Sequence, residues 1–286
     1  MKFYLVGSRG MLASDLALML EECGELTGRD LPEIDITDIE CLRRDMGAAA
    51  PDVVINCAAY TAVDKAEEEE SACHAVNAVG PANLATVCRE IGARLVHIST
   101  DFVFDGGTSR PYSEGDGAAP ISVYGKTKLA GERLTMQETD DYLIVRTSWL
   151  YGRHGNNFVK TVSRLAAERE SLGIVYDQTG TPTYARDLAQ ALINLISVEA
   201  EPGIYHFSNE GVCSWYDFAY EIINMLQSKG ESLKLKELNP ILSREYPTAA
   251  ARPAYSVMNK GKYKRITSKT IPHWRDALSR YFKEEV

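Results

Sequence analysis

A tyrosine and a lysine stand four residues apart in the segment V-Y-G-K-T-K, residues 123–128. On a helix, side chains at positions i and i+4 share a face, so Tyr124 can face Lys128 while Lys126 points elsewhere. A phenol, with an ordinary pKa of about 10, is a poor acid-base group at neutral pH unless a nearby cation stabilises its phenolate. The pair could therefore protonate an oxygen atom on which negative charge develops. A pair at this spacing also occurs as an ordinary surface contact, so its meaning depends on the elements around it.

A glycine-rich turn near the N-terminus is the first such element. The first expected strand runs directly into G-S-R-G-M-L-A, residues 7–13, and a helical pattern follows. This turn is typical of dinucleotide binding, because Gly7 and Gly10 permit a close approach of a pyrophosphate, and the helix N-terminus offers N–H groups and a positive dipole end. Ala13 is small enough for helix and strand to pack closely. The alternative is a purely structural turn between a strand and a helix.

The end of the second expected strand carries Arg29 and Asp30. They follow the glycine turn by about twenty residues, where dinucleotide-binding folds recognise the adenosine ribose. A carboxylate there would hydrogen-bond the ribose hydroxyls of NAD, whereas a guanidinium would pair with the 2′-phosphate of NADP. Because both groups are present, the choice between NADH and NADPH stays open, and a polar loop without a ligand is the alternative interpretation.

The fourth expected strand ends in Ser99-Thr100-Asp101, and the helix that carries Tyr124 follows after a long loop. In an open α/β sheet, ligands collect at the carboxyl ends of the strands, where both features should lie. Hydride delivery to a ketone builds negative charge on its oxygen, which donors must hold or protonate. Thr100, Tyr124 and Lys128 would therefore suit carbonyl reduction, with Thr100 holding the substrate oxygen and Lys128 also bonding the nicotinamide ribose.

Short apolar runs alternate with longer amphipathic segments along the chain, the pattern of βαβ units that feed a parallel sheet. We therefore expect an α/β fold, a Rossmann-type doubly wound parallel sheet with a smaller mixed α/β C-terminal lobe. The alternation weakens near residue 150, so residues 1–150 should form the NAD(P)-binding domain and residues 151–286 mainly the substrate-binding lobe, with 173–197 returning to the first domain. Strands are expected at 2–6, 25–29, 52–57, 94–99, 142–147, 173–177 and 203–208. Helices are expected at 10–22, 38–47, 67–91, 123–138, 155–170, 184–197 and 214–228.

Composition narrows the class of protein further. The 286 residues carry a formal net charge of −9, so the chain has no basic field for nucleic acid or an anionic membrane. The six cysteines are scattered without a C-x-x-C pair, which indicates free thiols in a reducing compartment. The N-terminal apolar run, residues 3–6, is too short for a signal sequence or a membrane span. We expect a cytoplasmic protein that binds neither nucleic acid nor a membrane.

The order and spacing of several segments resemble the extended short-chain dehydrogenase/reductase family, and within it the dTDP-4-dehydrorhamnose reductases. The resemblance extends over nearly the whole chain. Its segments are G-S-R-G-M-L at 7–12, N-C-A-A-Y-T-A-V-D-K-A-E at 56–67, S-T-D-F-V-F-D-G at 99–106, Y-G-K-T-K-L-A-G-E at 124–132, R-T-S-W-L-Y-G at 146–152, G-N-N-F-V-K-T at 155–161 and D-Q-T-G-T-P-T at 177–183.

The resemblance implies NADPH- or NADH-dependent reduction of the C4 keto group of dTDP-4-dehydro-L-rhamnose to dTDP-L-rhamnose. Tyr124 would be the proton donor, Lys128 its ribose-binding partner, and Thr100 the group that tunes the donor. The implied cofactor contacts are Gly10, Met11 and Leu12 at the pyrophosphate, Asp35 and Ile36 at the adenine side, and Ala59, Tyr60 and Thr61 at the nicotinamide side. The implied substrate contacts are Thr100, Asp101, Tyr124 and Trp149 at the sugar, and Asn157, Lys160 and Arg252 at the thymidine diphosphate. Trp149 could instead be a core residue, and the last three could be surface or structural residues.

Two rival functions share this pattern. A sugar-nucleotide dehydratase or epimerase has the same fold, but dehydratases tend to carry T-D-E after the strand, whereas Phe102 follows Asp101 here. A non-catalytic regulatory subunit could keep the fold and bind NADP, although intact Thr100, Tyr124 and Lys128 argue against that role. No hard-cation ligand cluster is visible in the sequence, so we expect no metal. We expect a monomer or a homodimer.

Overall fold

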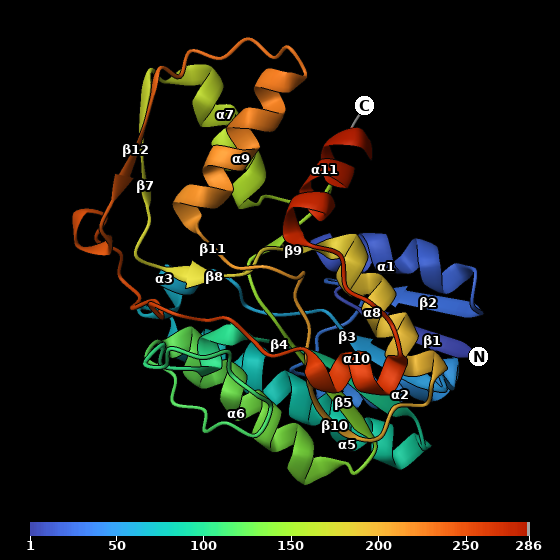
Figure 1. The fold of residues 1–286 in the computed structure, drawn as a ribbon. Coiled ribbons are helices and arrows are strands. Elements are labelled where there is room, and N and C mark those ends of the chain that lie inside the picture. The colour runs from blue at the N-terminus through green and yellow to red at the C-terminus, as the bar shows by residue number, and fades with distance from the viewer. Residues whose placement is uncertain (285–286) are drawn as a thin grey trace.

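A six-stranded parallel sheet forms the centre of the computed structural model, which describes residues 1–284 (Figure 1). Its strands lie in the order β10-β5-β4-β3-β1-β2, and each is parallel to its neighbours. The order reverses between β1 and β3, the kind of switch point at which doubly wound sheets bind ligands. The predicted fold class is confirmed. The strands are β1 (Lys2–Val6), β2 (Glu25–Arg29), β3 (Val53–Asn56), β4 (Arg94–Thr100), β5 (Tyr142–Thr147) and β10 (Gly203–His206).

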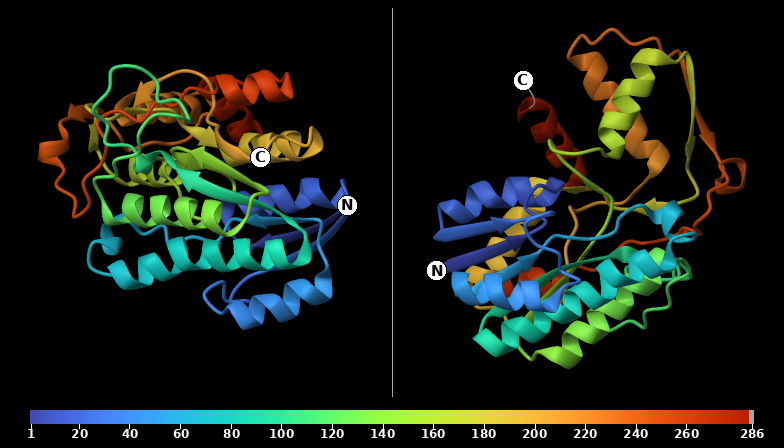
Figure 2. Two further views of the ribbon diagram at one scale, coloured as in Figure 1. Left: turned by 90° about the horizontal axis from the view of Figure 1, so that it is seen from below. Right: turned by 180° about the vertical axis from the view of Figure 1, so that it is seen from behind.

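Helices cover both faces of this sheet (Figure 2). Successive side chains of a strand face opposite sides, so Phe3 and Leu5 enter one buried cluster while Tyr4 and Val6 enter the other. A strand covered on both faces needs apolar residues at every position, which explains the unbroken run F-Y-L-V. The first face is covered by α1 (Met11–Glu21), α8 (Ala185–Ser197) and α10 (Gly261–Thr267). The second is covered by α2 (Ile39–Ala49) and α5 (Gly80–Ile91), with α6 (Val123–Glu138) packed beside α5.

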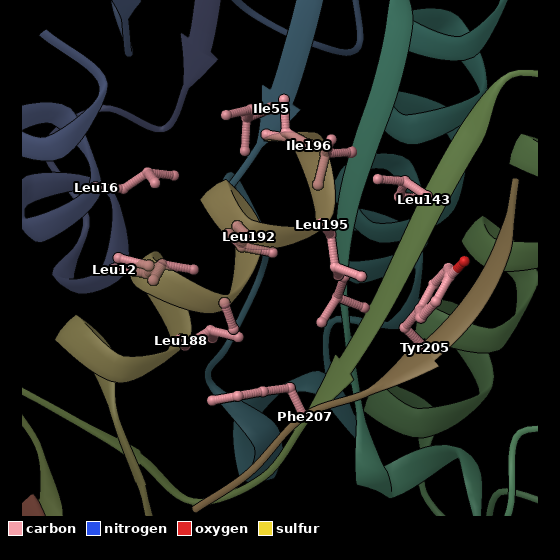
Figure 3. Close-up of a cluster of buried hydrophobic side chains, with 14 of the residues drawn as sticks. Leu12, Leu16, Ile55, Leu143, Leu188, Leu192, Leu195, Ile196, Tyr205 and Phe207 are labelled. Atoms are coloured by element: carbon pink, nitrogen blue, oxygen red, sulfur yellow. The ribbon is translucent and has the colours of Figure 1, made fainter. Parts of the chain in front are cut away.

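The first-face cluster joins residues that are far apart in sequence (Figure 3). Leu12 and Leu16 of α1 meet Leu188 and Leu192 of α8, and all four are 0–5% exposed. Burying a leucine side chain contributes about 1.5–3 kcal/mol, so this contact fixes α1 and the glycine turn before it firmly against α8.

The remaining elements form a third buried cluster, away from the main sheet, with their own small sheets. The expected strand 173–177 is β7 (Ser171–Val175), which pairs with β12 (Glu237–Ile241) outside the main sheet. In contrast, β10 pairs with β5 in the main sheet, and α8 covers one face of that sheet. The segments of the main sheet and those of the C-terminal elements therefore alternate along the chain. The boundary near residue 150 stays a prediction. The other elements are β6 (Leu150–Tyr151), β8 (Thr179–Gly180), β9 (Thr183–Tyr184), β11 (Cys213–Ser214), α7 (Phe158–Glu168), α9 (Trp215–Ser228) and α11 (Trp274–Glu284).

The helix expected at 67–91 is divided into several elements. The α-helix α4 (Glu70–His74) widens into the π-helical turn η1 (Ala75–Val79) before α5 begins, and α3 (Val63–Ala66) precedes it. Asn77 in the π-helical turn donates from Nδ2 to the carbonyl oxygen of Tyr60 at 3.0 Å and accepts the Tyr60 N–H at 2.9 Å. The widened turn thus holds the loop after β3, and π-helical turns often mark functional sites.

Residues 250–258, which we call the C-terminal strap, cross the molecule near the end of the chain. Ala250 donates its N–H to Asp64, and isolated bridges join Tyr255 to Thr179 and Met258 to Tyr112. The strap thus contacts α3 and the loop after β4 at one end of the main sheet, and also β8 among the C-terminal elements. No helix among residues 1–284 is long and apolar enough to cross a bilayer.

Candidate active site

A cleft of about 590 Å³ opens at the carboxyl ends of the central strands. Its walls come from the glycine turn, the ends of β4 and β5, the first turns of α6, and the start of α9. The cleft brings together ten of the residues that the sequence singled out, namely Gly10, Met11, Leu12, Ala59, Thr61, Thr100, Asp101, Tyr124, Lys128 and Trp149. Those outside its lining are Gly7, Arg29, Asp30, Asp35, Ile36, Tyr60, Asn157, Lys160 and Arg252.

The glycine turn has the geometry that a pyrophosphate requires. Gly7 has φ +71°, and a Cβ atom there would lie 2.7 Å from the backbone nitrogen of Ala58. Gly10 caps α1 without any side-chain hydrogen bond to the helix, so the first N–H groups of α1 keep no side-chain partner. Met11 and Leu12 carry these N–H groups at the cleft wall. The residues therefore fit a dinucleotide phosphate at this helix end.

The two candidate ribose ligands are both engaged within the protein. Arg29 donates from Nε to Asp45 at 2.9 Å, and this hydrogen bond raises the pKa of the guanidinium. Asp30 accepts the backbone N–H groups of Arg9 at 2.9 Å and Leu31 at 2.8 Å. Asp30 thus braces the glycine turn, whereas Arg29 would have to leave Asp45 to pair with a 2′-phosphate.

The predicted adenine contacts lie at different depths. Asp35 is exposed and accepts the Thr37 N–H at 2.9 Å, while the Ile36 side chain is 6% exposed and belongs to the core of the second face. A Cβ atom on Gly80 would lie 2.3 Å from Cδ1 of Ile36, so α5 packs directly on it. Ile36 could therefore meet a ligand only through a small part of its surface.

The loop after β3 presents alternate side chains to the cleft. Ala59 and Thr61 line it, whereas the Tyr60 hydroxyl turns away and donates to Glu69 at 2.6 Å. Asn77 fixes the backbone between them, so this orientation is built into the fold.

Tyr124 lies in the first turn of α6, whose start is held from two sides. Ser122 accepts the Gly125 N–H at 3.2 Å as the helix cap, and Glu67 accepts the Val123 N–H at 2.9 Å. A Cβ atom on Gly125 would lie only 2.2 Å from the carbonyl oxygen of Phe102, so glycine lets α6 approach the end of β4. Through this approach the Tyr124 ring meets the ring of Phe102 edge to face, with centroids 5.5 Å apart.

Tyr124 and Thr100 line the cleft together. Burial raises the pKa of Tyr124 above its usual value, and the neighbouring Thr100 hydroxyl opposes that rise. The phenol is therefore protonated at neutral pH, which is the state that a proton donor needs. The same Thr100 hydroxyl lies 3.1 Å from Oδ1 of Asp101.

Lys128 is 2% exposed, yet it lines the same cleft as Tyr124. Its Nζ donates to the carbonyl oxygen of Ile98 at 2.6 Å and lies 3.4 Å from Nε2 of His97. Burial lowers the pKa of Lys128 to about 8, because an ammonium loses solvation in the interior. The Tyr124–Lys128 spacing thus places both groups at one cleft, with the amine anchored to β4.

Asp101 is the buried carboxyl group of the cleft, with 2% of its surface exposed. Burial raises its pKa to about 6. Its Oδ2 has no hydrogen-bond partner among the described residues, so this oxygen can accept a hydrogen bond from a ligand.

Two tryptophans form the opposite wall. Trp149 stacks on Trp215 with ring centroids 3.6 Å apart, and both rings line the cleft. Trp149 has φ +47°, which is uncommon for a bulky residue and marks a strained backbone. A Cβ atom on Gly180 would lie 2.6 Å from the Trp149 ring, so the indole is enclosed on that side too.

The three predicted diphosphate ligands make contacts within the protein. Asn157 caps α7 by accepting the Lys160 N–H at 3.2 Å, and Nζ of Lys160 donates to the carbonyl oxygen of Arg153 at 2.5 Å. Arg252 in the C-terminal strap pairs with Asp64 at 2.8 Å. Asp64 follows the cleft residue Val63, so Arg252 lies near the rim of the cleft.

Several cleft residues escaped the sequence reasoning. They are Cys57, Val63, Phe102, Ser148, Gly155, Asn156 and Trp215 among others. All of these except Trp215 lie within the segments that carry the family resemblance, so those segments could have indicated them. Trp215 has no such signal, because only the fold brings the start of α9 to the end of β5. In the part of the chain that the structure describes, no three His, Cys, Asp or Glu side chains gather as a metal site, and the expectation of no metal stays a prediction.

The doubly wound sheet, the glycine turn and the helix that carries Tyr124 and Lys128 together define the class of NAD(P)-dependent oxidoreductases. The sequence matches the family described as RmlD substrate binding domain over residues 1–286. The chain therefore belongs to the RmlD family of nucleotide-sugar reductases.

Individual relatives agree with this assignment. The chain is similar to the spore coat polysaccharide biosynthesis protein SpsK of Bacillus subtilis, at 41% identity over 99% of this chain and 97% of that protein. It is 39% identical to the dTDP-4-dehydrorhamnose reductase of Aggregatibacter actinomycetemcomitans, over 97% of each chain. The dTDP-4-dehydrorhamnose reductase of Bacillus anthracis, solved in complex with NADP, has a TM-score of 0.93 and 39% identity over 99% of each chain. The family resemblance is thus confirmed. The expected nicotinamide cofactor is also confirmed, in that a solved relative contains bound NADP.

Proposed function

We propose that this protein reduces the C4 keto group of dTDP-4-dehydro-L-rhamnose to give dTDP-L-rhamnose. The observation that carries the proposal is that Thr100, Tyr124 and Lys128 line one cleft together with the N-terminus of α1. The full-length similarity to dTDP-4-dehydrorhamnose reductases supports the choice of substrate.

In this proposal the cofactor lies across the carboxyl ends of the strands. The N–H groups at the start of α1 hold its pyrophosphate, and Ala59 and Thr61 flank the nicotinamide. NADPH or NADH, when bound, supplies the hydride. Lys128 orients the nicotinamide ribose, because its amine is anchored to β4 by the carbonyl oxygen of Ile98. Residues 1–150, with α8 and β10, form the cofactor part, and most of residues 151–286 form the substrate part.

Side chains of the cleft then stabilise or protonate the C4 oxygen as negative charge develops on it. Tyr124 donates its proton to the C4 oxygen, and Thr100 positions that hydroxyl. Asp101 accepts a sugar hydroxyl through its free Oδ2. Trp149 offers an apolar face to the 6-deoxy sugar, and the surrounding apolar wall excludes water, which strengthens the hydrogen bonds at the oxygen.

The diphosphate must overcome the net charge of −9, so a local cation is required. Arg252 is the candidate nearest the rim, with its guanidinium held by Asp64. Lys160 and Asn157 support the loop 152–156 at the other side. In the proposal, the Arg252 guanidinium leaves Asp64 and pairs with the diphosphate of the substrate, because an arginine fork pairs well with phosphate oxygens.

The direct test is oxidation of NADPH and NADH by the purified protein with dTDP-4-dehydro-L-rhamnose, with dTDP-L-rhamnose identified as product by NMR. A parallel reaction should contain dTDP-4-keto-6-deoxy-D-glucose, which differs in the configuration of the sugar ring. Faster reduction of the second sugar would assign a different keto-sugar nucleotide to the same chemistry. Cofactor binding without oxidation by either sugar would instead favour the regulatory subunit.

A further inference from the structure

The indole of Trp149 lies in a slot between two segments of the C-terminal elements. Trp215, which follows β11, stacks on one face of the indole with ring centroids 3.6 Å apart. Gly180 of β8 borders the slot as well, because a Cβ atom there would lie 2.6 Å from Cε2 and 2.7 Å from Cζ2 of Trp149. The proposed function assigns no role to Gly180.

Gly180 lies over a face of the indole and not beside its edge. Nε1 is bonded to Cε2, so a Cβ atom beside that edge would lie at least as close to Nε1 as to Cζ2. The third nearest atom is instead Oγ of Ser256, at 2.9 Å. No atom of Trp215 is among the three nearest, so Gly180 and Trp215 cover opposite faces of the Trp149 ring. Gly180 covers its face at the Cε2–Cζ2 bond, and the rest of that face remains for the cleft.

The backbone of β8 is held on both of its edges, so it cannot easily move away from the indole. On one edge, Gly180 pairs with Cys213 of β11 in an antiparallel ladder. On the other edge, Thr179 donates its N–H to the carbonyl oxygen of Ala254 and accepts the N–H of Ser256, both at 2.8 Å. A shift of Gly180 would therefore break hydrogen bonds to β11 or to the C-terminal strap.

The far side of the slot is closed by further aromatic rings. The Phe158 ring lies 4.6 Å from the ring of Trp215, and it stacks in turn on Phe218 at 5.6 Å, each measured between centroids. Phe218 is 0% exposed and belongs to the third buried cluster. Because protein interiors are close-packed, this column leaves Trp149 little room to move toward Trp215. The open side of the slot is the cleft, which both indoles line.

We propose that Gly180 is a positioning residue of the sugar site: because it has no side chain, the Trp149 indole can stand back in the slot and leave the cleft wide enough for the sugar ring. A side chain at position 180 would push the indole toward the cleft. Gly180 contacts neither substrate nor cofactor and acts only through Trp149. The benefit for sugar binding rests on the proposed function, whereas the position of the indole can be tested without turnover.

The first experiment reads the position of the indole. Two stacked indoles give an exciton couplet in the circular dichroism spectrum, and Trp149→Phe identifies this couplet by removing it. Gly180→Ala is the variant to compare, because Gly180 is not among the residues with positive φ and alanine adds a single methyl group. We expect the couplet to weaken in Gly180→Ala, since the indole is displaced from its stack on Trp215. An unchanged couplet would overturn the proposal.

The second experiment reads the sugar site. We expect Gly180→Ala to raise the KM for dTDP-4-dehydro-L-rhamnose by about tenfold or more, the scale of one methyl group in a tight pocket. The KM for the cofactor should change little, because the glycine turn and Lys128 lie on other elements. Gly173→Ala in β7 is the matched control, since its Cβ atom would meet the side chain of Ile241 and not a cleft residue. Equal losses for cofactor and sugar in Gly180→Ala would overturn the proposal.

Combined variants identify the neighbour that the added methyl group displaces. The methyl group also approaches the Ser256 hydroxyl, so the two neighbours must be separated. In a Trp149→Phe background, Gly180→Ala should have little effect on the KM for the sugar, because the smaller ring leaves part of the slot empty. In a Ser256→Ala background the effect should persist in full. The reverse pattern would overturn the proposal.

Two further outcomes are also decisive. If Gly180→Ala does not fold, the protein that carries both Gly180→Ala and Trp149→Phe should fold, because the clash with the indole is then relieved. Failure of both variants to fold would overturn the proposal. If the unaltered protein reduces no keto sugar, the proposed function fails, and the circular dichroism couplet then supports or overturns the position of the indole by itself.

Discussion

Trp149 and Trp215 stack face to face on the cleft wall, with their ring planes 8° apart. Trp149 follows β5, whereas Trp215 opens α9, so the stack joins the central sheet to the C-terminal helices. Because Trp149 has φ +47°, its backbone conformation persists only while its surroundings hold it. The stacked ring of Trp215 is part of those surroundings.

Removing the stack should weaken substrate binding selectively. We expect Trp215→Ala to raise the KM for the keto sugar by about tenfold, since an aromatic pair contributes roughly 0.5–1.5 kcal/mol beyond its buried area. Steady-state kinetics with both substrates measures this effect, and the KM for the cofactor should change little. Trp215→Phe keeps an aromatic ring, so its KM for the keto sugar should lie between those of the unaltered protein and Trp215→Ala. Equal losses for cofactor and sugar would contradict the assignment of this wall to the substrate.

The Tyr124 hydroxyl should matter for chemistry and not for cofactor binding. We expect Tyr124→Phe to lower turnover by at least about a hundredfold, the scale of a positioned acid. Cofactor affinity, measured by fluorescence titration, should stay near normal. Tyr60→Phe is the matched control, because that hydroxyl faces Glu69 and not the cleft. Full turnover by Tyr124→Phe would exclude Tyr124 as the proton donor.

Asp101 should lower the stability of the protein at neutral pH. Its folded pKa of about 6 lies above the ordinary 3.8, so its favourable contribution is complete below pH 3.8 and is lost as the pH rises through 6. We expect Asp101→Asn to increase the free energy of unfolding above pH 6 by up to about 3 kcal/mol, with no gain in acid.

Urea unfolding at several pH values tests this expectation. Asp105→Asn provides a comparison of opposite sign, because the N–H of Gly107 lowers the pKa of Asp105. That variant should lose stability at neutral pH, and the loss should fade as the pH falls. A gain for Asp101→Asn that is the same at every pH would point to packing instead of charge.

Gly7 should tolerate no side chain. We expect Gly7→Ala to destabilise the protein by about 1–3 kcal/mol, because φ +71° is strained for alanine and its Cβ would meet the backbone at Ala58. Cofactor affinity should fall with it, as thermal unfolding and titration can measure. Gly47→Ala in α2 is the control, since a Cβ there meets nothing within 4 Å and should stabilise the helix by up to about 1 kcal/mol.

The contact between Arg29 and Asp45 should influence the choice of cofactor. We expect Asp45→Asn to lower the KM for NADPH relative to NADH by up to about fivefold, the scale of a partly exposed ion pair, because Arg29 becomes free for a 2′-phosphate. Kinetics with the two cofactors measures the ratio. If the ratio is unchanged, Arg29 does not approach the ribose.

The sequence predicted well whatever depends on local spacing. The glycine turn, the strand end at Thr100 and the Tyr124–Lys128 pair each lie within one short segment, and the parallel sheet brought them to one edge as expected. The apolar run at residues 2–6 likewise predicted the strand β1.

The partners of charged side chains could not be predicted in this way. Arg29 and Arg252 pair with Asp45 and Asp64, contacts that depend on how α2 and the C-terminal strap are placed. The π-helical turn at 75–79 was missed because its benefit, the hold on Tyr60, is a tertiary contact and has no local signature.

The interleaving of the chain sets the order in which the protein can fold. The sixth strand β10 and the covering helices α8 and α10 follow most of the C-terminal elements in sequence, and the strap that reaches Asp64 begins at residue 250. During synthesis the first five strands of the sheet therefore leave the ribosome with one apolar face covered by α1 alone. We expect that nascent chains ending before about residue 200 need chaperone protection, because such a face is prone to aggregate.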